Sequence, residues 1–243
     1  TLETLASIAA VAVQNALLFA QSDWISEIVH EIRTPLTAIL SYADLLLRPD
    51  LDSTMREKFA IIIRQEAERL NEQANQFLDL ARLESGRETM AYEVLHLPTV
   101  VALSANVMQP LAKEKERRLC VQVPDDLPRT IGDSKHIHRA LLNLISNAIK
   151  YSDPGDMVEV KGWVEDDEII IAVSDSGPGI PEDQIGNLFK KFSRLSINEQ
   201  KAQGSGLGLV ITRQIIEAHH GHIWVKSEVG QGTTFYFSLP IIT

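Results

Sequence analysis

A histidine, a glutamate and a threonine stand close together near the start of the chain, in a segment that could carry nucleophilic chemistry. Residues 26–37 read SEIVHEIRTPLT, which places Glu31 directly after His30 and Thr34 one helical turn further on. An exposed imidazole beside a carboxylate can act as a nucleophile with a general base at hand. Pro35 lacks an amide proton, so we expect the helix to bend there. On these residues alone, an ordinary solvated helix face is the more common explanation.

A second group of polar residues follows one face of an amphipathic helix that we expect over residues 134–150. Asn143, Asn147 and Lys150 recur at intervals of four and three residues, so they stack on a face apart from the apolar stripe. Amide oxygens are ligands for hard cations, and lysine offers a point charge to phosphate. Taken alone, the pattern is more typical of a plain polar helix face.

Two glycine-rich turns lie in the C-terminal part of the chain. Residues 175–180 read DSGPGI after an expected buried strand, and residues 204–209 read GSGLGL before an expected helix. Such turns let the backbone approach a ligand, and free amides at a helix N-terminus can hold phosphate oxygens. No strand leads directly into the second turn, which disfavours a Rossmann site. The stretch before it fits either a mobile clamp over polyphosphate or a solvated loop, and its cations are Lys190, Lys191, Arg194 and Lys201.

Long helices must position the histidine segment, because no glycine precedes Gly86. Apolar residues recur every three or four positions over residues 2–19 and, in a shifted register, over residues 25–46. This pattern predicts a coiled coil that enters a helical bundle and slips in register near residues 20–24.

A turn at residues 48–53, with Ser53 or Thr54 as N-cap, leads to a second expected helix over residues 54–85. Its apolar face is expected at Phe59, Ile63, Leu70, Ala74, Phe77 and Leu80. One hairpin cannot bury both apolar stripes, so two copies forming a four-helix bundle are the economical arrangement.

The remainder of the chain predicts an α/β layered domain that must position the polar helix and the glycine turns. We expect helices over residues 95–116, 134–150, 183–195 and 207–218. We expect strands over residues 119–123, 157–164, 168–174, 222–226 and 233–239.

Composition limits the function classes. The 243 residues carry a net charge of −10, which argues against a nucleic-acid partner. Cys120 is the single cysteine, and we interpret it as a core thiol rather than a redox sensor. It cannot form an internal disulfide, which favours a reducing compartment and a cytoplasmic location.

Neither a membrane span nor a signal peptide is indicated by the sequence. Because the chain begins with Thr1, we expect it to be part of a longer protein. The histidines at positions 219, 220 and 222 raise the alternative of a metal site, although a structural role at a helix end is simpler.

Together and in this order, these segments resemble the sensor histidine kinases of two-component systems over about residues 23–239. Residues 30–37 look like the H box with the phosphoacceptor histidine, and residues 143–151 look like the N box. Residues 175–179 and 204–208 look like the G1 and G2 boxes. Phe189 and Phe192 look like the F box, residues 230–235 like the last glycine box, and residues 1–20 like the closing helix of a GAF sensor domain.

The resemblance implies a helical hairpin that forms a dimeric four-helix bundle, followed by an α/β sandwich ATP-binding domain. It divides the chain into a signalling helix over residues 1–22, a dimerisation and phosphotransfer hairpin over residues 23–88, a hinge linker over residues 89–98 and a catalytic domain over residues 99–243.

The resemblance also implies residue roles. His30 would accept the γ-phosphoryl group of ATP, Glu31 would assist as general base, and Thr34 would orient water when the partner is dephosphorylated. Arg194 would reach the γ-phosphate from a lid, and Asn147 would ligate Mg²⁺.

On the nucleotide side, Asp175 would accept a hydrogen bond from the exocyclic amine of adenine, and Thr233 would support that end of the site. The other positions implied for nucleotide binding are Asn143, Lys150, Tyr151, Gly177, Gly179, Ile180, Phe192, Gly204, Ser205, Gly206, Leu207, Gly208 and Leu209.

The implied function is that of a homodimeric, ATP- and Mg²⁺-dependent protein-histidine kinase that phosphorylates itself and then an aspartate of a response-regulator receiver domain. The implied partners include no nucleic acid, and this part of the protein would not contact a membrane. The alternative is an ATPase or nucleotide-gated interaction module without phosphotransfer, like the related chaperone and topoisomerase domains. Those domains lack the His30 hairpin, which separates the two hypotheses.

Overall fold

The computed structural model describes residues 25–85, 89–193 and 205–242. The chain divides into two compact units, Thr1–Leu78 and Asp79–Thr243. The expected signalling helix over residues 1–22 and the expected register slip near residues 20–24 lie outside the described residues, as do Arg194 and Gly204. Within the described part of the chain, none of the helices combines the length and apolar character that spanning a bilayer requires.

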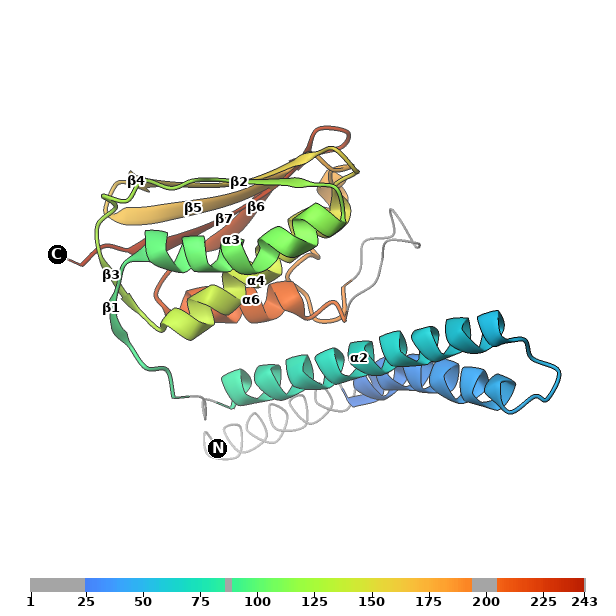
Figure 1. Ribbon diagram of the computed structural model, residues 1–243. Helices are drawn as coiled ribbons and strands as arrows, with labels where there is room; N and C mark the ends of the chain where they lie inside the picture. Colours follow the sequence, from blue (N-terminus) through green and yellow to red (C-terminus); the bar gives the residue numbers. More distant parts are fainter. Residues whose placement is uncertain (1–24, 86–88, 194–204, 243) are drawn as a thin grey trace, which may run out of the picture. The chain divides into compact units, whose positions relative to one another are not determined.

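The first unit holds a hairpin of two helices, as the sequence predicts, except for the end of the second helix from Asp79 onward, which belongs to the second unit (Figure 1). Residues 25–46 form the first helix, and α2 spans Ser53–Glu84. The guanidinium of Arg56 closes the turn between them by donating hydrogen bonds to main-chain carbonyls that the helix end leaves unpaired. These carbonyls belong to Leu46, Arg48 and Leu51, at 3.1–3.3 Å.

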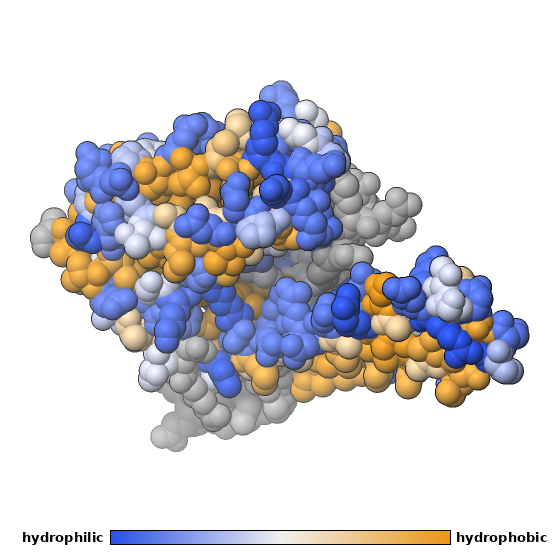
Figure 2. Space-filling view, in the orientation of Figure 1, coloured by the Kyte–Doolittle hydropathy of each residue, from blue (hydrophilic) through white to orange (hydrophobic). Residues whose placement is uncertain are grey.

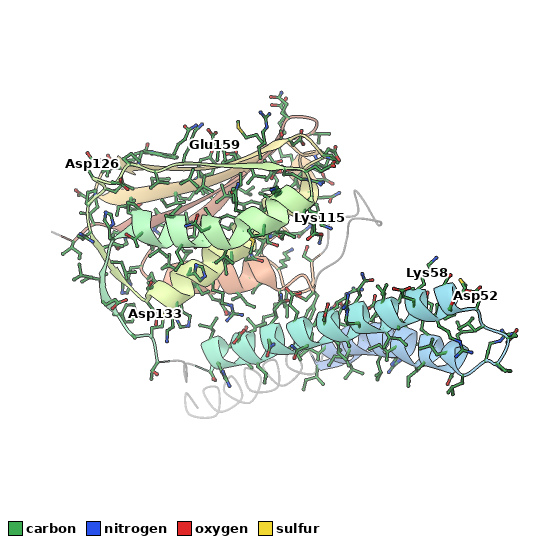
Figure 3. The ribbon with its side chains drawn as sticks, in the orientation of Figure 1. Asp52, Lys58, Lys115, Asp126, Asp133 and Glu159 are labelled. Carbon is green, nitrogen blue, oxygen red and sulfur yellow. The ribbon has the colours of Figure 1, made fainter. Side chains whose placement is uncertain are left out.

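Asp52, labelled in Figure 3, caps α2. Its carboxylate accepts a hydrogen bond from the amide of Met55 at 2.8 Å. The sequence analysis placed the cap at Ser53 or Thr54, which both lie inside the helix. A carboxylate accepts from the free amides as a hydroxyl would, and its charge also interacts favourably with the positive end of the helix dipole.

Apolar residues of the first helix fall into an inner and an outer stripe. Pro35 is buried in the hairpin, and the ring of Tyr42 packs against Phe59 of α2 with 5.3 Å between centroids. The outer stripe recurs at intervals of four and seven residues and is 43–82% exposed in the single chain. It consists of Ile25, Val29, Leu36, Leu40 and Leu47. Figure 2 shows apolar residues gathered along this hairpin. We call the five residues Ile25, Val29, Leu36, Leu40 and Leu47 the open stripe.

The second unit is built on a five-stranded sheet in the order β2-β4-β5-β7-β6. β2 runs parallel to β4, and the other neighbours are antiparallel. The strands are β2 Arg118–Gln122, β4 Met157–Glu165, β5 Glu168–Asp175, β6 Ile223–Glu228 and β7 Gly232–Pro240. A separate antiparallel pair joins β1 Glu93–Leu95 to β3 Thr130–Gly132.

Helices cover one face of this sheet (Figure 1). They are α3 Leu97–Glu114, α4 Ser134–Tyr151 and α6 Gly208–Ala218. Between α4 and the sheet lies the core, in which Leu144, Ile171 and Phe237 have no exposed surface. Burying these side chains is the main favourable term for the unit and leaves the polar face of α4 free for other contacts.

The opposite face of the sheet carries a row of aromatic rings. Trp224 stacks on Tyr236 at 5.4 Å between centroids, and Trp163 meets Tyr236 edge-on at 6.4 Å. Ile170 and Ala172 of β5 lie on the same face and are 3–4% exposed. The central strand is therefore apolar on both faces, which explains its unbroken run of aliphatic residues.

Asp133, labelled in Figure 3, is the N-cap of α4 and links the start of this helix to Ala91 through hydrogen bonds. Its carboxylate accepts from the amides of Ala91, Lys135 and His136 at 2.8–3.2 Å. Burial by itself raises the pKa of Asp133, but the hydrogen bonds and the nearby His136 ring outweigh it and lower the pKa to about 2. The carboxylate is therefore ionised under all ordinary conditions.

His219, at the end of α6, serves the structure rather than a metal. Its Nε2 accepts from the amide of Asp133 at 2.8 Å, so Nδ1 carries the proton and donates to the carbonyl of Ile215 at 2.6 Å. Burial lowers the pKa of this imidazole, which keeps it neutral. Among the described residues, no group of three potential ligands converges on a metal position.

Three local expectations differ from the structure. Residues 93–98, assigned to the linker and a helix, form β1, its exit and the first turn of α3, which begins at Leu97. Helix 183–195 was expected, but α5 ends at Ile185, and Phe192 has a φ of +59° that no helix allows. β3 was not anticipated, because three residues are too short to show a strand pattern.

Candidate functional site

His30 is exposed on the first helix, where a reactant in solution can reach it. Thr34 lies one turn further on, and its hydroxyl donates to the carbonyl of His30 at 3.4 Å. Pro35 follows and cannot donate to the carbonyl of Glu31, and the helix continues through it to residue 46. The Glu31 carboxylate is part-buried and accepts a hydrogen bond from Gln73 of α2 at 3.4 Å. The hairpin therefore presents an imidazole and a carboxylate on consecutive residues, with the carboxylate tied to the second helix.

In the second unit, α4 carries the polar face that the sequence analysis identified. Asn147 and Lys150 are part-exposed, next to the buried residues that anchor the helix. The Lys150 ammonium lies over the Tyr151 ring at 4.9 Å from its centroid and 3.4 Å from its hydroxyl. This contact keeps a positive charge at the C-terminal end of α4 without burying it.

Asn143 joins α4 to the start of α6. Its side-chain amide donates to the Thr212 hydroxyl at 2.9 Å, and that hydroxyl donates to the carbonyl of Gly208 at 2.9 Å. A Cβ at position 208 would clash with Asn143 Oδ1, so a larger residue there would displace the Asn143 side chain from its present position. Thr212 is 1% exposed, and thus a buried polar chain holds the GSGLGL turn against the polar helix.

Asp175 ends the central strand β5 with a carboxylate in a largely desolvated position. Burial raises its pKa to about 6, although hydrogen bonds from the amides of Gly177 and Thr233 lower it, and the charge of Asp156 adds a smaller rise. The Gly177 bond is 2.9 Å long. At neutral pH the carboxylate is ionised, oriented by two amides and poised to accept further hydrogen bonds.

The first glycine turn packs directly on the end of α4. A Cβ on Gly177 would lie 2.8 Å from the carbonyl oxygen of Tyr151. Gly179 has a φ of +71°, and a Cβ there would lie 2.1 Å from the carbonyl of Glu228. These close approaches explain why the turn needs glycine at both positions.

The β6–β7 loop holds the other side of this turn. The amide of Gly230 donates to the carbonyl of Pro178 at 2.8 Å, and the amide of Ile180 donates to the Ser227 hydroxyl at 2.8 Å. Ser227 also contacts the Thr233 hydroxyl at 2.9 Å. Thr233 thus supports the Asp175 end through its amide and through Ser227.

The second glycine turn adjoins the F-box position. Gly206 has a φ of +69°, and a Cβ there would lie 2.9 Å from the Phe192 backbone. Ser205 accepts from the amide of Leu207 at 3.1 Å, and Leu207 is fully buried before α6 begins. Leu209 lies part-exposed in the first turn of α6. The helix start that would offer amides to phosphate is therefore anchored on its apolar side.

The described residues fit a nucleotide with Mg²⁺. Asn147 supplies an amide oxygen, a ligand type that Mg²⁺ accepts when phosphates and water complete its shell. The described part of the chain contains no acidic metal cage that would bind the ion by itself. Neighbouring glycine turns and Lys150 supply the backbone amides and the charge that phosphates need.

The structure brings most of the predicted nucleotide residues together, from α4, both glycine turns and the β6–β7 loop. His30, Glu31 and Thr34 belong to the hairpin, which is a separate unit. Sequence reasoning missed Thr212, Ser227 and Gln73. For Thr212, the spacing of four residues from Gly208 was a usable signal, whereas Ser227 and Gln73 depend on contacts between distant segments.

Two segments of the chain match family models of known proteins. Residues 20–86 match the family model of the His Kinase A (phospho-acceptor) domain. Residues 132–243 match the model of the histidine kinase-, DNA gyrase B-, and HSP90-like ATPases.

Among curated relatives, the circadian input-output histidine kinase CikA of Synechococcus elongatus is 35% identical over 95% of the chain. The chain spans 31% of that relative's length. The mycobacterial sensor histidine kinase MprB is a similar solved structure, with 30% identity, a TM-score of 0.54, and coverage of 62% of this chain and 98% of that chain. Another similar solved structure is full-length ShkA in complex with AMPPNP, with 28% identity and a TM-score of 0.67. The match covers 88% of this chain and 44% of the ShkA chain.

Replacing Asp175 with asparagine should stabilise the second unit at neutral pH. The variant keeps an oxygen for the amides but removes a buried negative charge, so Asp175→Asn should unfold at a higher temperature than the original chain at pH 7.5. The difference between the two unfolding temperatures should be smaller at pH 5, because the raised pKa of Asp175 means that the original carboxyl is then mostly protonated in the folded state. Thermal unfolding at both pH values checks this, with exposed Asp183→Asn as the control. A difference in unfolding temperature that is the same or larger at pH 5 would show that Asp175 is not a desolvated carboxylate with a raised pKa.

Removing the Thr212 hydroxyl should loosen the GSGLGL turn. Thr212→Val keeps the side-chain shape but leaves the amide of Asn143 without its acceptor, so affinity for a Mg²⁺-bound non-hydrolysable ATP analogue should fall about tenfold. Thr212→Ser should bind nearly as tightly as the original chain. Isothermal titration calorimetry measures both, and equal affinity of the valine variant would show that the chain of hydrogen bonds does not shape the site.

Proposed function

The chain belongs to the histidine kinase family of two-component signalling, and we propose that it transfers the γ-phosphoryl group of ATP to His30 and then to an aspartate of a response-regulator receiver domain. The observation that supports this most is an exposed His30 beside a part-buried Glu31 on a helical hairpin, together with a second unit whose N-box and glycine-box residues adjoin one another. In the transfer, a ring nitrogen of His30 forms a bond to the γ-phosphorus, the bond from that phosphorus to the bridging oxygen breaks, and ADP leaves.

On the hairpin, Glu31 accepts the proton that the imidazole gives up. General-base assistance of this kind requires a carboxylate within hydrogen-bond reach of the proton. Glu31 lies next to His30 in sequence and is already tied to α2. Exposure of His30 leaves its ring free to meet a phosphoryl donor held elsewhere.

On the second unit, Asp175 accepts a hydrogen bond from the adenine amine, and Thr233 supports it. Lys150 and Tyr151 follow the phosphates and ribose, while the amides that begin α6 hold phosphate oxygens. Asn147 holds Mg²⁺, which when bound neutralises phosphate charge. We include Arg194 and Gly204, outside the described residues, as the γ-phosphate contact and the first glycine of the loop.

The two reactants reside on separate units, so they must approach each other for transfer and part again for the receiver domain to dock on the hairpin. We propose residues 84–98, between the end of α2 and the first turn of α3, as the hinge for this motion. Within this segment, the amide of Ala91 donates to the Asp133 carboxylate.

A second copy of the chain covers the open stripe in this proposal. Five large apolar side chains that recur at intervals of four and seven residues are costly to leave in water, and a four-helix bundle buries them at the centre of a dimer. We place the dimer in the cytoplasm, where ATP is supplied.

An ATPase or nucleotide-gated module without phosphotransfer is the second candidate, because the family model matched by residues 132–243 also includes gyrase B and HSP90. The hairpin favours the kinase, since residues 20–86 match a phospho-acceptor domain.

Incubation with ATP labelled at the γ-phosphate tests the function. The chain should acquire label that is stable in alkali and lost in acid, as expected of a phosphoimidazole, and His30→Gln should acquire none. His138→Gln, which alters a histidine of the second unit, is the control and should still be labelled. Equal labelling of the His30→Gln chain would refute the proposal.

Thr34 separates the two directions of phosphoryl flow. Its hydroxyl lies one turn from His30 but is not the nucleophile, so Thr34→Ala should keep its autophosphorylation rate within about twofold and slow the dephosphorylation of a phosphorylated receiver domain about tenfold or more. The matched control is Thr37→Ala, because the Thr37 hydroxyl likewise donates to a main-chain carbonyl one turn earlier, that of Arg33. A chain that Thr34→Ala renders unable to autophosphorylate would contradict this division of roles.

A further inference from the structure

A glutamine occupies the buried side of α2 where an apolar residue would be expected. Gln73 is 3% exposed, and the buried residues that follow it at helical spacing are Phe77 and Leu80. The sequence pattern had assigned this face to Ala74, which is only part-buried. An amide in an apolar layer is costly unless both of its ends are hydrogen-bonded.

Only the N–H end of this side-chain amide is hydrogen-bonded among the described residues. Gln73 Nε2 donates to Glu31 Oε2 at 3.4 Å, linking α2 to the first helix across the hairpin. Gln73 Oε1 is buried and has no hydrogen-bond partner among the described residues. The residue therefore leaves an acceptor unsatisfied while it holds the Glu31 carboxylate, and stability alone does not explain its presence.

The neighbourhood of Glu31 makes an external tether useful. Pro35 cannot donate to the Glu31 carbonyl, so the helix lacks one of its regular hydrogen bonds at this residue. A glutamate side chain also has freely rotating bonds that must be restricted before it can act on a neighbouring ring. A donor from a second, rigid helix restricts them.

We propose that Gln73 is a positioning residue for phosphoryl transfer, which holds the Glu31 carboxylate where it receives the proton of the His30 imidazole. Its amide donates to Oε2 of the carboxylate and so restricts the rotation of the side chain that accepts the ring proton. Gln73 does not touch ATP or the phosphoryl group, and it acts through Glu31 alone. This inference rests on the proposed kinase function.

Gln73→Met tests the role, because methionine has a similar length and volume but no N–H donor. The rate of His30 phosphorylation at saturating Mg²⁺-ATP should fall about tenfold, while the KM for ATP stays unchanged, since nucleotide binds to the other unit. Thermal stability should be equal or higher, because the variant removes an unsatisfied buried acceptor. Lower activity with undiminished stability is not expected of a residue that only supports the fold.

Gln65→Met is the matched control, because Gln65 lies exposed on the same helix. It should leave the rate and the KM unchanged. Gln73→Leu repeats the test with a different apolar shape, so that the outcome does not depend on one variant folding.

A double-mutant cycle with Glu31→Gln decides whether Gln73 acts through Glu31. Phosphate incorporation is followed for hours to quantify slow variants. If the proposal holds, Gln73→Met slows the original chain about tenfold but has no effect in the Glu31→Gln background. The proposal is overturned if Gln73→Met leaves the rate unchanged, or if it slows both backgrounds equally. Phosphate incorporation into the original chain tests the proposed function separately. If His30 acquires no phosphate while Gln73 and Glu31 are both present, the kinase function itself is refuted.

Discussion

Negative charge on the phosphoryl group sets opposite requirements on the two sides of the proposed reaction. The donor side needs backbone amides and a cation fixed in advance, because dipoles that need not reorient stabilise transferring charge most effectively. The acceptor side needs an imidazole that projects into solvent, since a buried ring could not be reached. The chain meets these requirements on separate units, with the nucleotide residues packed around α4 and His30 exposed on the hairpin.

On both units, polar groups are retained at a cost in stability. Asp175 keeps a carboxylate in a desolvated position, where its pKa rises to about 6. Gln73 keeps a buried carbonyl that has no hydrogen-bond partner in the part of the chain that the structure describes. In each case a neutral or apolar residue would suit the fold better, and the polar group can be explained by what it does for a ligand or a neighbouring base.

The sequence predicted much of this arrangement because its strongest signals are local. Heptad spacing indicated the hairpin, glycine turns marked two loops, and amphipathic spacing in α4 placed Asn147 and Lys150 on one face. What it could not predict depends on contacts between distant segments. The bond between Asn143 and Thr212 joins residues 69 positions apart, and the bond between Gln73 and Glu31 spans 42. Short elements were also missed, since β1 and β3 are three residues long and pair only with each other.

Transfer of phosphorus from a nucleotide held by one unit to an imidazole on the other is the central claim. Mass spectrometry of peptides from the chain after incubation with Mg²⁺-ATP, prepared without acid, tests it most directly. The account predicts a mass increase of one phosphoryl group on the peptide that contains His30 and on no other, with one ADP released for each group incorporated. A phosphoryl group on a different residue, or an unmodified His30 in chains that release ADP, would contradict it.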